Sequence, residues 1–204
     1  MKSLFQKLTK STDTKFITVV SGLPRSGTSM MMKMLEAGGI PPMTDKIREA
    51  DADNPKGYYE FERVKQMDKG DTAWVPEARG KVVKVISALL KYLPPSEQYR
   101  VIFVRRNMSE ILASQRKMLV NRGEDPDKQD DAQMALLFEK HLNQVESFLA
   151  SQPNVQTLYL HYNEILTDPQ TQASKIISFL GLDLNEEAMT EAVDPMLYRN
   201  RQNS

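Results

Sequence analysis

Short, nearly continuous apolar runs rich in β-branched residues alternate with segments of helical periodicity along most of the chain. Such runs are typical of strands that are buried on both faces of a parallel sheet. We expect four strands, at 16–20, 81–86, 100–104 and 155–160. We expect helices at 28–37, after Asn107, at 132–150 and after Asp168. Alternation of this kind predicts an α/β fold with a parallel sheet of four or five strands, flanked by helices in a three-layer sandwich.

The patterns also predict where helices end and which side chains they bury. Asn107 can cap the helix after the third strand, and Asp168-Pro169 opens the last long helix, which Gly181 closes. Gly38-Gly39 should stop the first helix. In the helix after Asn107, the positions expected to face the core are Ile111, Leu112, Met118 and Leu119. In the helix at 132–150, they are Ala135, Phe138, Leu142, Val145 and Leu149.

The first strand ends in a loop bounded by Gly22 and Gly27. A strand that turns through such a loop into a helix directs backbone N–H groups and the positive end of the helix dipole at one point. In a parallel sheet this point lies at the carboxyl ends of the strands, where ligands bind. We therefore predict a phosphate or sulfate site made by Leu23, Pro24, Arg25, Ser26, Gly27, Thr28 and Ser29.

The loop has the spacing of a nucleotide-binding P-loop, so the expected sandwich is P-loop-like. However, Thr28 stands where that motif has its lysine, and the only cation inside the loop is Arg25. A triphosphate hydrolase would lose its β/γ-phosphate contact, which weakens a kinase or NTPase interpretation.

Composition limits the classes of function. The 204 residues suit one domain, 1–204, with residues 1–14 as a short amphipathic turn or a mobile arm. Lysine plus arginine equals aspartate plus glutamate at 27 each, so no global field would recruit nucleic acid or an anionic membrane. Without cysteine and with only His141 and His161, we expect no metal site, and we expect His141 to be structural or exposed. Without a secretory signal or an apolar run of spanning length, we expect a cytoplasmic protein that contacts no membrane.

Two further places combine cations with the ends of strands. Lys84 lies among valines in the second strand, so it either reaches an open cleft at the strand end or meets an anion. Arg106 follows the third strand, and Ser114 comes two helical turns later. An arginine fork with a hydroxyl from the adjacent helix can bind a phosphate.

The sequence from Gly22 to Thr28, between a strand and a helix, resembles the loop of the sulfotransferase family that grips the 5′-phosphosulfate of 3′-phosphoadenosine 5′-phosphosulfate (PAPS). Residues 101–114 are similar to the segment of that family that binds the 3′-phosphate, which implies that role for Arg106 and Ser114. Residues 158–164 resemble the strand near the adenine, which implies a nucleotide contact for Tyr162; a tyrosine at the edge of the core is the alternative. By the same resemblance Arg199 or Arg201 reaches the 3′-phosphate, or lies in a solvated tail.

The resemblance implies transfer of a sulfuryl group from PAPS to a hydroxyl or amine, leaving adenosine 3′,5′-bisphosphate, without a metal. Many family members continue the lysine strand as Lys-Thr-His, whereas this chain has Lys84-Val85-Ile86 and lacks that histidine base. Arg25 and Lys84 would serve as the catalytic cations, and Glu60 is the first candidate for the base. Glu62, Asp45 and Asp53 stay open as alternatives.

The acceptor is expected to be a small molecule, and the loops at 40–56 and 71–80 are expected to shape its pocket. Its identity and the oligomeric state are left open by the sequence. Two other interpretations remain: a divergent P-loop nucleotide kinase or hydrolase, and a nucleotide-binding module without catalytic activity.

Overall fold

The computed structural model describes residues 15–45, 59–127 and 130–194. The predicted N-terminal arm, most of the loop expected at 40–56, Asp53, Arg199 and Arg201 lie outside these described residues.

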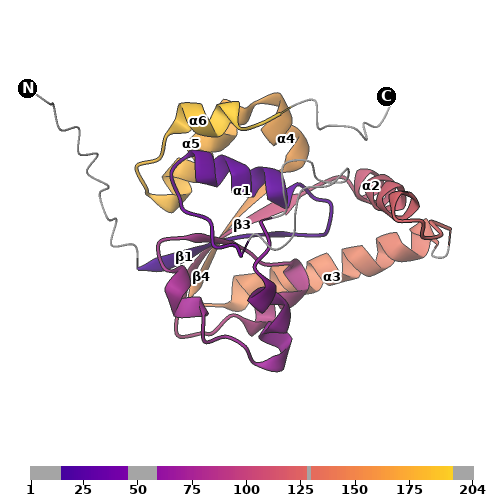
Figure 1. Cartoon of the computed structure of the whole chain (residues 1–204), viewed down its shortest axis with the longest axis horizontal. Helices are drawn as coiled ribbons and strands as arrows, with labels where there is room; N and C mark the ends of the chain where they lie inside the picture. The colour runs from indigo at the N-terminus through magenta and orange to yellow at the C-terminus, as the bar shows by residue number, and fades with distance from the viewer. Residues whose placement is uncertain (1–14, 46–58, 128–129, 195–204) are drawn as a thin grey trace, which may run out of the picture.

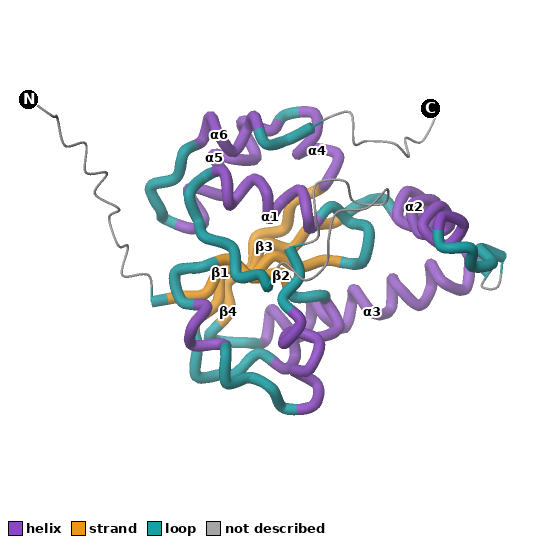
Figure 2. The backbone as a smooth tube through the Cα atoms, in the orientation of Figure 1, coloured by secondary structure: helices purple, strands orange, loops and turns teal. Residues whose placement is uncertain are grey.

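A four-stranded parallel sheet forms the centre of the molecule (Figure 2). Its strands are β1 (Phe16–Gly22), β2 (Val82–Lys84), β3 (Gln98–Arg105) and β4 (Val155–His161), in the order β2-β1-β3-β4. The two central strands carry the most apolar runs, because both of their faces are covered. The predicted α/β class is confirmed, with four strands. The edge strand β2 is shorter than the segment 81–86 expected from the sequence.

Helices cover both faces of the sheet (Figure 1). On one face lie α1 (Thr28–Ala37), α4 (Tyr162–Thr167), α5 (Pro169–Leu180) and α6 (Glu186–Glu191). On the other lie α3 (Asp131–Ser151) and the 3₁₀ helices η1 (Glu62–Lys69), η2 (Val75–Ala78) and η3 (Ser87–Tyr92). Because strand side chains alternate, neighbouring residues serve opposite cores: Val20 and Ile102 pack under α1, whereas Val19 and Val101 pack towards α3.

The helix ends follow the sequence signals in most places. The Asp168 side chain accepts a hydrogen bond from the Thr171 amide at 3.1 Å, Pro169 opens α5, and Gly181 closes it with φ 59°. Helix α1 ends before Gly38 and Gly39 as predicted. The predicted cap of α2 (Met108–Asn121) is wrong, since Asn107 takes the capping position but its side chain makes no capping hydrogen bond.

The predicted inward stripes of α2 and α3 are only partly correct. Of the four apolar positions expected to be buried in α2, only Ile111 is, and in α3 only Val145 and Leu149 are. The reason is that α2 and the N-terminal half of α3 extend beyond the sheet (right side of Figure 1), so that part of each stripe meets no core.

Candidate active site

The glycine-bounded loop leaves the carboxyl end of β1, between β2 and β3, and leads into α1. Both glycines are required by close contacts. A Cβ on Gly22 would lie 2.5 Å from the Val104 carbonyl oxygen, and one on Gly27, whose φ is 103°, would lie 2.4 Å from Cδ2 of Tyr162. The loop is therefore packed tightly between β3 and α4, which fixes where its backbone amides lie.

The entry of the loop into α1 brings hydrogen-bond donors together. Gly27 occupies the N-cap position without a side-chain capping bond, so the first amides of the helix need partners from elsewhere. The hydroxyl of Ser26 is buried and has no hydrogen-bond partner among the described residues. A loop with these features suits an anion, which could accept hydrogen bonds from several donors at once.

Arg25, at the tip of the loop, is held by both residues of the second predicted motif. Its φ of 70° is left-handed, a conformation that a non-glycine residue keeps only when its surroundings impose it. Its carbonyl oxygen accepts a hydrogen bond from Nη1 of Arg106 at 3.0 Å, and its own Nε donates to Oγ of Ser114 at 2.9 Å. Residues more than 80 positions apart in the chain thus meet at one point.

Arg106 is almost completely buried, with 7% of its side chain exposed. Its Nε donates to Oε2 of Glu110 at 2.9 Å, and its guanidinium lies 4.3 Å from the centre of the Tyr162 ring. Asn163 donates to the other oxygen of Glu110 at 3.1 Å. Burial raises the pKa of Tyr162, partly offset by the positive charge of Arg106, so the phenol stays neutral. A buried guanidinium needs partners of this kind.

Glu110 was not singled out in the sequence. The available signal was an acidic side chain four residues after Arg106 at a helix start, where the two can pair. An acid in the first turn is also a common helix-dipole feature, so the pattern alone does not mark a site.

Lys84 is the last residue of β2 and lies beside Val20 of β1, two residues before the loop begins. It therefore occupies the strand end and is half-buried. The side chain of Glu60 is 17% exposed, and its Oε2 lies 2.9 Å from Nζ of Lys65.

Asp45 and Glu62, two of the other candidates for the base, hold the start of η1 together. Asp45 Oδ2 accepts a hydrogen bond from the Glu62 amide at 2.6 Å, and the Glu62 carboxylate pairs with Lys65 at 2.7 Å. The structure thus places these two carboxylates and Glu60 around the same chain segment.

A serine–histidine pair lies next to the end of β2. Oγ of Ser87, which is 3% exposed, and Nε2 of His141 on α3 are 2.9 Å apart. Burial, with a smaller effect of the Lys91 charge, lowers the pKa of His141. No spacing in the sequence indicates this pair, because its members are 54 residues apart.

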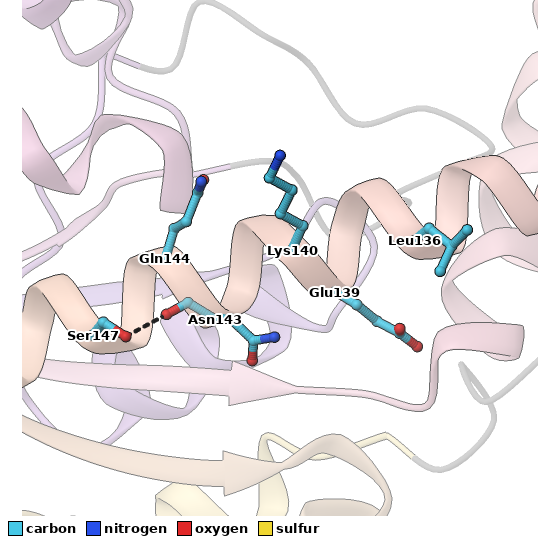
Figure 3. Close-up of a pocket in the computed structure, with 6 residues that line it drawn as sticks. All are labelled: Leu136, Glu139, Lys140, Asn143, Gln144 and Ser147. Carbon is cyan, nitrogen blue, oxygen red and sulfur yellow. Dashed lines mark hydrogen bonds between the residues drawn. The ribbon is translucent and has the colours of Figure 1, made fainter.

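An open pocket of about 630 Å³ lies along α3 (Figure 3). Its described lining comes from one helix face and contains none of the predicted site residues: Leu136, Glu139, Lys140, Asn143, Gln144 and Ser147. The Ser147 hydroxyl already donates to the Asn143 carbonyl within the helix. The converging cations lie at the loop, so the loop is the candidate site. Within the described ranges no group of three or more metal-ligating side chains gathers, and no helix is long and apolar enough to cross a membrane.

Comparison with known proteins gives the family. The fold is shared by a crystal structure of a mouse sulfotransferase complexed with PAP, with 20% identity and a TM-score of 0.56 over 87% of this chain and 62% of that one. It is also shared by the sulfotransferase domain of the Synechococcus PCC 7002 olefin synthase, with 15% identity and a TM-score of 0.53 over 94% of this chain and 82% of that one. The sulfotransferase domain from the curacin biosynthetic pathway has 16% identity and a TM-score of 0.51 over 93% of this chain and 78% of that one. This chain thus spans less than two thirds of the mouse protein. Residues 15–204 match the model of the sulfotransferase domain, and the chain belongs to that family.

Proposed function

We propose that the protein transfers a sulfuryl group from PAPS to a hydroxyl or amine of a small-molecule acceptor, leaving adenosine 3′,5′-bisphosphate (PAP). The observation that carries this proposal is the meeting of Arg106 and Ser114 at Arg25, on the tip of a glycine-bounded loop. Family membership supports the same reaction, and the mouse protein of the same fold was crystallised with PAP.

The residues at the loop fit such a nucleotide. The backbone of residues 22–29 and the guanidinium of Arg25 would hold the phosphosulfate, where the Ser26 hydroxyl lacks a partner among the described residues. Arg106 and Ser114 would hold the 3′-phosphate, with Tyr162 beside the nucleotide. Arg199 and Arg201 remain candidates for the 3′-phosphate and lie outside the described residues.

The bound donor supplies a sulfuryl group already activated on a phosphate. The chain has to stabilise the negative charge on the sulfate and the leaving phosphate, and to take a proton from the acceptor. Arg25 and Lys84 supply positive charge at the ends of β1 and β2, which are neighbouring strands. Glu60 is the proposed base.

Transfer of the ³⁵S label from PAPS to a panel of phenols, alcohols and amines tests the proposal. We expect a labelled organic product. Lys84→Ala should slow transfer by about 100-fold, because it removes a charge that stabilises the transition state, while changing PAP affinity only a few-fold. Wild-type turnover in this variant would contradict the role of Lys84.

The other functions predict different outcomes. Tight PAP binding without transfer to any acceptor of a broad panel would favour a nucleotide-binding module without catalytic activity. Magnesium-dependent binding of ATP would favour a divergent P-loop kinase or hydrolase.

A further inference from the structure

A single buried carboxylate joins three parts of the candidate site. Glu110, in the first turn of α2, has 1% of its side chain exposed. One of its oxygens accepts from Nε of Arg106 and the other from Nδ2 of Asn163, at 2.9 and 3.1 Å. The end of β3, the start of α2 and the start of α4 therefore meet at this side chain.

These contacts fix the guanidinium of Arg106 on three sides. Glu110 holds Nε, the Arg25 carbonyl holds Nη1, and the ring of Tyr162 covers one face at 4.3 Å. A planar guanidinium restrained in this way has one orientation, and its remaining N–H groups point in fixed directions. Of the three contacts, only the one with Glu110 is an ion pair.

We propose that Glu110 is a positioning residue of the nucleotide site, which holds Arg106 in the orientation that meets the 3′-phosphate. This inference rests on the proposed function. Glu110 is itself an anion and would repel a phosphate, so its favourable contribution is geometric. A test has to keep the charge and change the geometry.

Glu110→Asp meets this requirement. The carboxylate keeps its charge but is one methylene shorter, so it cannot reach Arg106 and Asn163 together. Calorimetry with PAP and with AMP, which lacks the 3′-phosphate, separates the two parts of the site. We expect PAP affinity to fall at least about tenfold, as for loss of a hydrogen bond to a charged group, and AMP affinity, measured at millimolar concentration, to change less than about threefold.

Glu97→Asp is the matched control. Glu97 is also buried and paired, with Arg79 at 2.7 and 2.6 Å, but it precedes β3 at the amino edge of the sheet, opposite the loop. This variant should lower the melting temperature and leave both affinities unchanged. If Glu110→Asp does not fold, Asn163→Ala removes the second anchor of the same carboxylate and should again reduce PAP affinity more than AMP affinity.

The outcomes are distinct. Equal losses of PAP and AMP affinity, or no loss, would overturn the positioning role, because a merely structural residue does not discriminate between the two nucleotides. A wild-type protein that binds no PAP would instead overturn the proposed function, and the inference with it.

Discussion

Gly27 has no room for a side chain, because the ring of Tyr162 lies against it. Gly27→Ala places a Cβ 2.4 Å from the Tyr162 ring, at a φ of 103°. The backbone conformation alone costs about 1–3 kcal/mol, and the clash adds to it by moving the ring on which Arg106 stacks. We expect a lower free energy of unfolding in urea and weaker PAP binding.

Gly39→Ala is the control for this prediction, since Gly39 has φ 107° but no atom within 4 Å of its Cβ position. This substitution should lower the free energy of unfolding by the backbone cost alone and should leave PAP affinity unchanged. Equal effects of the two substitutions on stability and on PAP affinity would contradict the packing of Tyr162 against the loop.

The place of a single residue in the candidate site was predictable from the sequence where the residue belongs to a motif. The loop and the pair of Arg106 and Ser114 follow strands, so their convergence at the carboxyl edge follows from parallel topology. The contact of Glu110 with Asn163 and the Ser87–His141 pair were not predictable, because these partners come from elements whose packing no local pattern encodes.

Helix α3 is joined to η3 by the hydrogen bond between His141 and Ser87, and the partial burial of the His141 imidazole makes stability depend on pH. Burial and, to a lesser extent, Lys91 lower the pKa of His141 in the folded protein below its usual value. Protonation is therefore easier in the unfolded chain. The stability gained from the neutral imidazole is present above the ordinary histidine pKa of about 6.5 and is lost as the pH falls from there towards the folded value.

We expect the free energy of unfolding of the wild type to fall more steeply from about pH 7 to about pH 5.5 than that of His141→Gln. Urea denaturation at several pH values measures this difference. His161→Gln, which replaces the exposed histidine at the end of β4, is the control. Parallel profiles for the wild type and His141→Gln would contradict the burial of His141.

The strands and the start of α5 were easier to predict than the burial of α2 and α3. A continuous run of β-branched residues is typical of a buried strand. Asp168-Pro169 is typical of a helix start, because the aspartate side chain can cap the helix and proline is favoured at its first position. A stripe of apolar positions along a helix shows which face of the helix can be buried, but not whether another element packs against that face. The stripe positions Ala135 and Phe138 on α3 are only half-buried for this reason.

The whole molecule carries no net charge, so its attraction for a nucleotide has to be local. The local charges at the loop are the cations Arg25, Arg106 and Lys84 and the carboxylate of Glu110, which pairs with Arg106. The proposed donor site differs from that of a kinase in that magnesium bridges the phosphates in a kinase.

Calorimetric titration of the purified protein with PAP and, separately, with ATP, each with and without magnesium, addresses this distinction. We expect binding of PAP that is unchanged by magnesium and is much tighter than that of ATP under either condition. Magnesium-dependent binding of ATP without binding of PAP would contradict the proposed sulfuryl donor site and would favour a true nucleoside triphosphate loop at residues 22–29.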